Sequence, residues 1–364
     1  MKVLHVINNL AGGGAEKLVS QLTISINTTN TCDVLLLNDR SDKYSESLRN
    51  NNVNIRVLNF GKYSIKNLIE IVKHININEY DVVHAHLFPT IYYVALSKWI
   101  LTIIKKHKAV YFMTEHNTTN RRREKPLFKY LERFIYSLYD NIICISEATY
   151  IELTQWLRLK SNTKVATVHN GIELNNFETA NAYDKKDFDL DKESIVLVMV
   201  GSFTEQKGHK VLIDAIHQLP EPFNAILVGE GGLLDEVKTY AHELDLSDRV
   251  QFLGYRSDVP QIVKMADIAV IPSNWEGFGL VAAEAMACGV PVVASNVPGL
   301  NSVVGDGGLL FDKGSAEGLR ENIAKLAENR ELYESVKNKA INRAKEYDIQ
   351  IMIKRYMDMY SSFK

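Results

Sequence analysis

Two glutamates eight residues apart are the most suggestive pair of reactive side chains in the sequence. Glu276 precedes Gly277, Phe278 and Gly279, and Glu284 lies in the apolar, small-residue segment that follows. The two glycines open several backbone N–H groups to an anion at the start of a predicted helix. A carboxylate beside a diphosphate would repel it, so we expect the two acids to face hydroxyl groups on either side of it, those of a sugar for one and those of a ribose for the other. The alternative, two surface glutamates, is disfavoured because an unpaired carboxylate in an apolar helix is costly.

Lys207 and Gly208 stand at a second junction, between an apolar run that ends near residue 200 and a segment with helical spacing. The helix dipole disfavours a cation at this end, so a lysine there is mild evidence for an anionic ligand such as a diphosphate. A solvated first-turn lysine is the alternative.

A third junction holds Gly12, Gly13 and Gly14 after the first apolar run. Three glycines let backbone amides approach a phosphate at the start of the next helix. The signal is weak, because Lys17 stands where a dinucleotide-binding motif has its last glycine. A tight turn is the alternative.

Histidines mark two more junctions. His116 follows an apolar run and is either a neutral hydrogen-bond partner, a positive contact to an anion, or a cap of the next helix. His84 and His86 share one face of a predicted strand, but no third ligand follows at metal spacing, so we interpret them as packing or cleft-lining residues.

The elements that must position these residues alternate along the chain. Short apolar runs are separated by helix-length segments, which is typical of strands buried on both faces and joined by parallel crossovers. The pattern runs from residue 3 to 169, stops over a polar stretch, and restarts at 195. It predicts two doubly wound α/β sheets with ligands at the carboxyl ends of the strands. From Ala316 the chain is predicted to be helical.

The amino-acid composition and net charge exclude several classes of protein. The chain has 364 residues, of which 46% are hydrophobic and 24% are charged, and a formal net charge of −2, which excludes a generic basic nucleic-acid binder. Its three cysteines form no C-x-x-C pair, which disfavours disulfides and a thiolate metal site. No signal-peptide core and no apolar run of roughly 18 residues is present. We therefore expect a cytoplasmic protein without a membrane span.

Positive charge is concentrated in one stretch, from Lys98 to Arg133, where ten Lys and Arg face three Glu and are interleaved with apolar residues such as Trp99 and Phe128. This pattern suits the surface of an anionic membrane, and we expect that neutralising Arg121, Arg122 and Arg123 would weaken such binding. An ordinary solvated helix face with its apolar side on the core fits equally well.

The assembled segments resemble, in order, those of retaining glycosyltransferases of family 4, also called group 1. Residues 276–284, E-G-F-G-L-V-A-A-E, match the E-x7-E motif of that family. Other similar segments include GGGAE (12–16), DVVHAH (81–86), TEHN (114–117), HNGIELNNF (169–177), KG (207–208), LVGEG (227–231) and CGVPVVAS (288–295).

The resemblance implies a GT-B fold, with two Rossmann-like domains that face a central cleft. It implies an acceptor domain over 1–178, a linker over 179–193, a nucleotide-sugar domain over 194–345 and a C-terminal helix over 346–364 that returns to the first domain. It also implies no obligatory metal or other cofactor. The D-x-D triplets at 187–191 are interpreted as solvated linker acids.

The same resemblance suggests which residues act. We expect Glu276, Lys207 and His116 to be catalytic. Ser202 stands where the family commonly has an arginine, so Arg256 is a candidate to supply the missing charge. The expected donor-binding residues are Gly13, Gly14, Ser202, Lys207, Gly229, Arg256, Glu276, Gly277, Phe278, Gly279, Leu280, Val281 and Glu284.

The leading functional hypothesis is transfer, with retention, of a hexosyl or N-acetylhexosaminyl group from a nucleotide sugar to an acceptor. The expected donor is UDP-linked, and the expected acceptor is a glycan or a lipid-linked molecule in bacterial surface polysaccharide synthesis. The protein would work in the cytoplasm, with peripheral contact to the inner face of the plasma membrane. Two alternatives are a non-hydrolysing nucleotide-sugar epimerase and, because of Ser202, a silent nucleotide-sugar-binding partner of another transferase.

Overall fold

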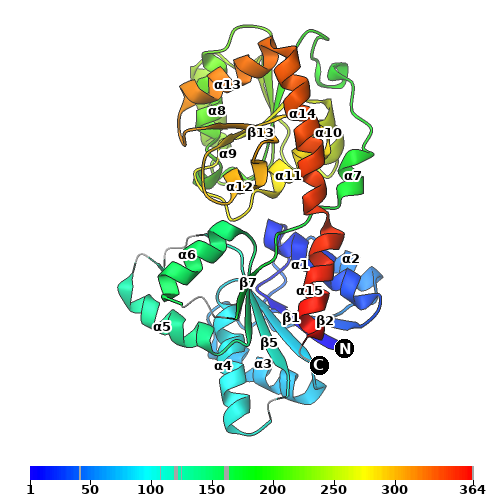
Figure 1. The fold of residues 1–364 in the computed structure, drawn as a ribbon, viewed down its shortest axis with the longest axis vertical. Helices are drawn as coiled ribbons and strands as arrows, with labels where there is room; N and C mark the ends of the chain where they lie inside the picture. Colours follow the sequence, from blue (N-terminus) through cyan, green and yellow to red (C-terminus); the bar gives the residue numbers. More distant parts are fainter. Residues whose placement is uncertain (41, 107, 119–121, 124, 160–163, 363–364) are drawn as a thin grey trace. The chain divides into compact units, whose positions relative to one another are not determined.

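The computed structural model describes residues 1–362 except 41, 107, 119–121, 124 and 160–163 (Figure 1). The chain divides into two compact units, one made of residues 1–170 with the C-terminal segment from 350, the other of residues 171–349. The segment 171–178, which we assigned to the first domain, and the proposed linker 179–193 therefore belong to the second unit.

The first unit is built on a parallel sheet with the strand order β3-β2-β1-β4-β5-β6-β7. Its strands are β1 (Lys2–Ile7), β2 (Thr31–Leu36), β3 (Asn54–Val57), β4 (Val82–His86), β5 (Val110–Glu115), β6 (Asn141–Cys144) and β7 (Val165–Thr167). The order reverses between β1 and β4, and such a switch point is where open α/β sheets bind ligands. The glycines at 12–14 follow β1, and His86 ends β4.

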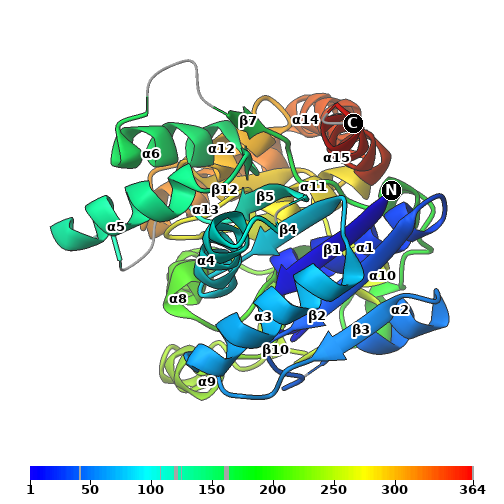
Figure 2. The same ribbon diagram turned by 90° about the horizontal axis from the view of Figure 1, so that it is seen from below.

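Helices connect these strands. They are α1 (Gly14–Asn27), α2 (Ser45–Asn50), α3 (Ile65–Asn78), α4 (Thr90–Ile103), α5 (Pro126–Ser137) and α6 (Glu147–Leu157). The last helix of the chain, α15 (Ile349–Ser361), also packs here. Figure 2 shows α5 beside α6, and these two helices are in contact.

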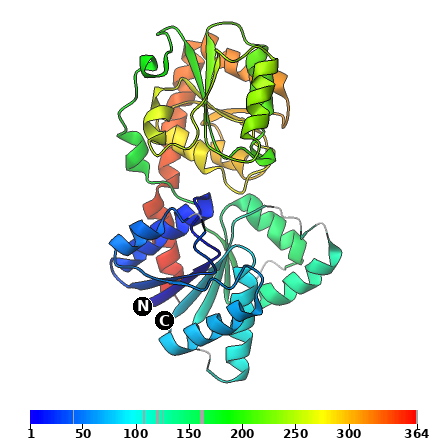
Figure 3. The ribbon, with the colours of Figure 1, turned by 180° about the vertical axis from the view of Figure 1, so that it is seen from behind.

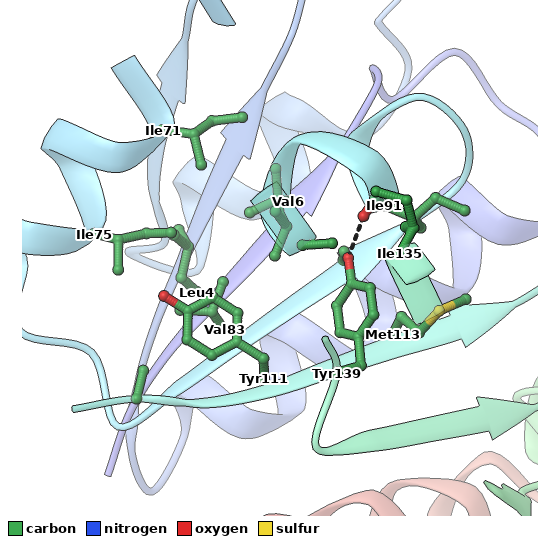
Figure 4. Close-up of a cluster of buried hydrophobic side chains, with 14 of the residues drawn as sticks. Leu4, Val6, Ile71, Ile75, Val83, Ile91, Tyr111, Met113, Ile135 and Tyr139 are labelled. Carbon is green, nitrogen blue, oxygen red and sulfur yellow. Dashed lines mark hydrogen bonds between the residues drawn. The ribbon is translucent and has the colours of Figure 1, made fainter. Parts of the chain in front are cut away.

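The two faces of the sheet differ in chemistry because successive side chains point to opposite sides. Leu4, Val83 and Tyr111 lie on one face, in an apolar cluster with Ile71 of α3 (Figure 4). The intervening residues face the other way, and among them are the histidines of β1 and β4.

The second unit contains a parallel sheet with the strand order β10-β9-β8-β11-β12-β13, flanked by helices (Figure 3). Its strands are β8 (Ile195–Val200), β9 (Phe223–Val228), β10 (Val250–Phe252), β11 (Ile268–Ile271), β12 (Val292–Ser295) and β13 (Gly308–Phe311). The switch point lies between β8 and β11. Both fold-class predictions, parallel sheets and a helical C-terminus, are confirmed.

The helices of this unit are α7 (Leu174–Glu178), α8 (His209–His217), α9 (Leu234–Glu243), α10 (Val259–Met265), α11 (Leu280–Ala287), α12 (Leu300–Val304), α13 (Ala316–Glu328) and α14 (Arg330–Ala344), with short 3₁₀ turns η1 (Lys185–Phe188), η2 (Glu205–Lys207) and η3 (Lys345–Tyr347). The segment 179–193 packs against the unit: Phe188 is buried, and its carbonyl accepts a hydrogen bond from Gln251 at 2.7 Å.

Candidate active site

The two motifs with the strongest chemical signal meet at the switch point of the second unit. Lys207 ends η2, in the loop after β8, and Glu276 lies in the loop after β11, the neighbouring strand. Asn274 holds the loops together, because its backbone N–H donates to the Gln206 carbonyl and its side-chain amide donates to the Glu205 carbonyl, both at 2.7 Å. The parallel topology therefore brings together residues that are 69 positions apart.

Lys207 and Glu276 form an ion pair. Lys207 Nζ lies 2.6 Å from Glu276 Oε1, and Ser273 Oγ donates to the same oxygen at 2.8 Å. Gln206 Nε2 donates to the other carboxylate oxygen at 3.4 Å. The side chains of Lys207 and Glu276 are only 18% and 8% exposed, so the pair is held largely away from solvent. A ligand that binds either group must share or break this contact.

Glycine is required beside the pair. Gly208 has φ +68, and a Cβ there would lie 2.2 Å from the Pro272 carbonyl oxygen of the facing loop. A Cβ on Gly299, which has φ +87, would lie 2.7 Å from the Glu276 carbonyl. These close approaches fix the backbone on both sides of the carboxylate.

The loop after Glu276 leads into α11 as the sequence indicated. Gly279 adopts φ +95 and precedes the first helical residues, Leu280 and Val281, without a side-chain cap. The first N–H groups of a helix have no partner within the helix, so this turn can receive an anion. Phe278 does not line such a site with its side chain, because its ring is buried and packs edge-on against Tyr347. Its predicted contact with a donor is limited to the backbone.

The remaining predicted donor residues have different surroundings. Glu284 is buried on α11, one helix turn past Leu280. Ser202 is exposed in the loop after β8. Gly229 has φ +145, and a Cβ there would lie 2.0 Å from the Gly201 carbonyl, so glycine lets the loops after β8 and β9 touch.

Arg256 does not supply a free charge at this site. Its guanidinium binds the Asp258 carboxylate, with Nε 2.7 Å from Oδ1, and Tyr183 donates to the same carboxylate at 2.6 Å. The hydrogen bond with Arg256 holds the pKa of Asp258 well below its usual range. Arg256 follows β10, which is separated from β8 by β9. The idea that Arg256 replaces the arginine expected at Ser202 is therefore not supported.

In the first unit, Gly13 and Gly14 stand at the start of α1 as predicted, and Gly12 has φ +106. A carboxylate that the sequence did not point out lies against them: a Cβ on Gly13 would meet Glu16 Oε2 at 2.4 Å. Burial raises the pKa of Glu16, and a bond from its own backbone N–H opposes that shift. An acid at the first turn interacts favourably with the helix end, so Glu16 stands where an anion would bind.

His116 is buried directly after β5 and belongs to a row of histidines. Its Nε2 lies 3.2 Å from His86 Nδ1, and His86 Nε2 lies 2.9 Å from His5 Nδ1. Burial lowers the pKa of His116 to about 4, so the imidazole is neutral at pH 7. This favours the interpretation as a neutral hydrogen-bond partner over that as a positive contact. The capping interpretation is wrong, since the two residues directly after His116 are not helical and the next helix among the described residues begins at Pro126.

The sequence analysis found no third metal ligand near His84 and His86, but the structure places His5 beside them. His5, His84 and His86 have ring nitrogens within 4.8 Å of one another, and His5 pairs with His84 in the strand register. His84 is hydrogen-bonded through one nitrogen to Thr114 and through the other to Tyr360 of α15. A metal ion would have to displace these bonds, so we interpret the three histidines as a packed polar row. The β1–β4 pairing was the signal that could have identified His5.

The comparisons with known proteins agree with this arrangement. Residues 12–176 match the family model described as Glycosyltransferase Family 4, and residues 181–343 match the one described as Glycosyl transferases group 1. The chain is 34% identical over 208 residues to an uncharacterized glycosyltransferase of Methanocaldococcus jannaschii, a match that covers 56% of this chain and only about half (54%) of that protein.

Two further proteins cover more of the chain. An Escherichia coli enzyme, UDP-Gal:alpha-D-GlcNAc-diphosphoundecaprenol alpha-1,3-galactosyltransferase, is 27% identical over 81% of this chain and 79% of its own. Anabaena Alr3699/HepE, solved in complex with UDP and glucose, has the same fold, with a TM-score of 0.87, 22% identity and full coverage of both chains. The fold is therefore GT-B, and the chain belongs to the group 1 glycosyltransferases of family 4.

Proposed function

We propose that this protein transfers a sugar from a UDP-linked donor to an acceptor with retention of the anomeric configuration. The observation that carries the proposal is the Lys207–Glu276 pair, a cation and a carboxylate placed together at the switch point beside the glycine-rich start of α11. A sugar diphosphate presents both hydroxyls and negative charge, and this pair offers a partner for each.

In this mechanism Lys207 and the first amides of α11 receive the diphosphate. Negative charge builds on that group as the bond to the sugar breaks, and donors that are already in place stabilise it. Glu276 accepts hydrogen bonds from hydroxyls of the donor sugar, and Glu284 accepts them from the ribose. His116, as a neutral imidazole, positions a polar group of the substrate. We propose that this chemistry needs no metal ion.

The names of related proteins support the choice of donor and acceptor. The Escherichia coli relative uses UDP-Gal and acts on a diphosphoundecaprenol-linked sugar, and HepE binds UDP and glucose. By analogy we propose a lipid-linked or glycan acceptor, a role in bacterial surface polysaccharide synthesis, and work in the cytoplasm next to the inner face of the plasma membrane. Among the described residues, no helix has the length and apolarity to cross a bilayer.

Ser202 keeps a second function open, that of a silent nucleotide-sugar-binding partner. It is exposed in the loop after β8, where the resemblance calls for an arginine. If Ser202→Arg creates transfer in a chain that otherwise only binds UDP, the silent-partner role is correct. Transfer by the unaltered chain excludes it.

The test combines binding and turnover on the full chain. UDP should raise the melting temperature, because a ligand that binds the native state stabilises it. A panel of UDP-sugars should then be incubated with a short-chain polyprenyl diphosphate sugar, with and without EDTA, and the anomer of the product read by NMR. We expect transfer that survives EDTA and a product with the donor's configuration. Inversion, dependence on added Mg²⁺, or conversion of the donor without acceptor would contradict the proposal, and the last result would indicate an epimerase.

A further inference from the structure

Helix α5 carries an apolar stripe on its outer side. Leu127, Tyr130, Leu131 and Phe134 are 79%, 71%, 44% and 46% exposed and follow the i, i+3, i+4, i+7 spacing of one helix face. The opposite side of the helix is already buried, through Ile135 and the neighbouring residues of the core. A surface helix normally keeps its apolar stripe on the core, so burial in the core of the unit does not explain this second stripe.

The end of α4 extends the stripe. Trp99 and Ile103 are 47% and 61% exposed and lie one turn apart. The rings of Trp99 and Phe134 meet edge to face, with their centroids 6.4 Å apart. Exposed apolar residues are common singly, but a continuous apolar face over two helices marks an interaction surface. We call these six residues of α4 and α5 the docking face.

Exposed cations flank the docking face along the chain. Lys105 and Lys106 are exposed directly after α4, and Arg133 is exposed on α5. Lys105 and Lys106 also line a pocket with Glu79, an exposed acid that is paired with Lys108. The acid of α5, Glu132, is fully buried and accepts hydrogen bonds from Arg122 and Trp156, so it does not offset these cations at the surface.

Two of the three arginines that the sequence favoured for this role, Arg122 and Arg123, are not part of the docking face. Arg122 is paired with Glu132, and Arg123 binds the Thr118 carbonyl and lies near the Glu115 carboxylate. Arg121 lies outside the described residues. Neutralising this triplet would disturb internal bonds, so it is a poor test of a surface function.

We propose that the docking face inserts into the surface of an anionic lipid bilayer. Aromatic and aliphatic side chains rimmed by Lys and Arg suit the boundary between acyl chains and anionic headgroups. Each basic residue near such a surface contributes about 1 kcal/mol of attraction, which is about a fivefold gain in binding. A second copy of the chain fits less well, because a symmetric contact would bring the same cations together.

The role of this docking, to bring the transferase to a lipid-linked acceptor, rests on the proposed function. The binding of the docking face to a lipid surface does not depend on the proposed function. Binding to vesicles and transfer to a water-soluble acceptor analogue are separate measurements, so either idea can fail alone.

The experiment uses the full chain and vesicles made of equal parts phosphatidylglycerol and phosphatidylcholine, with pure phosphatidylcholine as reference. Cosedimentation should be strong with the anionic vesicles at low salt, weak with the neutral ones, and reduced by added salt. Trp99 fluorescence should shift to the blue on binding, and Trp99→Phe should remove most of that shift.

Two sets of variants separate the apolar and the charged contributions. The apolar set is Leu127→Gln with Leu131→Gln, matched by Ile69→Gln with Ile77→Gln on the exposed side of α3. The charge set is Lys105→Gln, Lys106→Gln and Arg133→Gln, matched by Lys186→Gln, Lys192→Gln and Lys313→Gln in the second unit. All of these side chains are exposed, so the variants should fold.

We expect the apolar set to lower vesicle affinity at least tenfold, and the charge set to lower it about fivefold for each residue and to flatten its dependence on salt. The matched controls should bind like the unaltered chain. If the unaltered chain ignores anionic vesicles, or if both sets bind as well as their controls, the proposal is wrong. A dimer in sedimentation equilibrium that is broken by the apolar set, without vesicle binding, would assign the face to a second copy instead.

Discussion

At the scale of single residues, the buried charges of Lys207 and Glu276 stabilise each other. Both side chains are mostly buried, and each is the charged partner of the other at 2.6 Å. Removing one partner of such a pair leaves an uncompensated charge, which costs about 3–5 kcal/mol. Alanine would add a lost side-chain volume to this cost, whereas glutamine keeps the shape but still leaves Lys207 without its anionic partner. The melting temperature of the variant is therefore measured beside its kinetics.

We predict that Glu276→Gln lowers turnover by about two orders of magnitude, because the amide binds sugar hydroxyls less strongly than the carboxylate as the transition state forms. The UDP dissociation constant should not rise, since Lys207 loses a competitor for its charge. The measurements are steady-state kinetics and calorimetric titration with UDP.

Glu205→Gln is the matched control for this variant, because Glu205 is an exposed glutamate in the same pair of loops. It should leave both quantities unchanged. Near-normal turnover in Glu276→Gln would remove its assignment to the donor sugar. A loss of UDP affinity equal to that of Glu284→Gln would mean that the two acids do not divide the donor as proposed.

At the scale of elements, strand pairing buries a row of histidines, and this burial lowers their pKa values. His5 on β1, His86 on β4 and His116 after β5 form a chain of ring contacts on one face of the sheet. Burial lowers the pKa of His5 to about 3 and that of His116 to about 4. The folded state therefore holds these rings neutral at a pH where the unfolded chain takes up protons.

The sign of the pH dependence follows from this difference. Below pH 6.5 the unfolded histidines are protonated and the folded ones are not, so the free energy of unfolding falls as the pH falls from about 6.5 toward 4. Each buried histidine contributes up to about 1.4 kcal/mol for each pH unit. Urea unfolding between pH 7 and pH 5, above the range of most carboxyl groups, measures the slope.

His116→Gln should flatten that slope, and His217→Gln, an exposed histidine at the end of α8, should not. A slope that is the same in both variants would show that His116 is protonated in the folded protein. It would also contradict its assignment as a neutral partner in catalysis.

At the scale of the whole molecule, the first unit is completed by the end of the chain. Tyr360 on α15 is hydrogen-bonded to His84, a partner 276 residues earlier, and Tyr356 lies 3.3 Å from Thr114 Oγ1. Both tyrosines are fully buried. The unit therefore reaches its final packing only after the last helix has been made.

We predict that Tyr360→Phe lowers the free energy of unfolding of the first unit by about 1–3 kcal/mol, because it leaves a buried nitrogen of His84 without its partner. The measurement is urea unfolding followed by tryptophan fluorescence in a Trp275→Phe background, where Trp99 and Trp156 both report on the first unit. Tyr63→Phe, at an exposed tyrosine, is the control and should unfold like its parent. Equal stability of the two variants would show that the contact with His84 contributes nothing.

Much of this architecture follows from the sequence alone. Apolar runs that alternate with helical segments predicted two doubly wound parallel sheets, because strands buried on both faces must be apolar throughout. The same reasoning placed Lys207 and Glu276 at strand ends, and parallel strands end at one edge of their sheet. Because β8 and β11 are neighbours in the sheet, Lys207 and Glu276 are expected to lie close together.

Tertiary structure alone decided how the polar side chains pair. Lys207 binds Glu276, Arg256 binds Asp258 and Arg122 binds Glu132. Each of these cations has several acids within reach along the chain, and the choice depends on which loops the strand order brings together. Local periodicity describes one helix or strand at a time. It therefore could not show that Arg122 and Arg123 are turned inward while an apolar stripe of α5 is turned out. Both outcomes have the same spacing and differ only in what the rest of the fold covers.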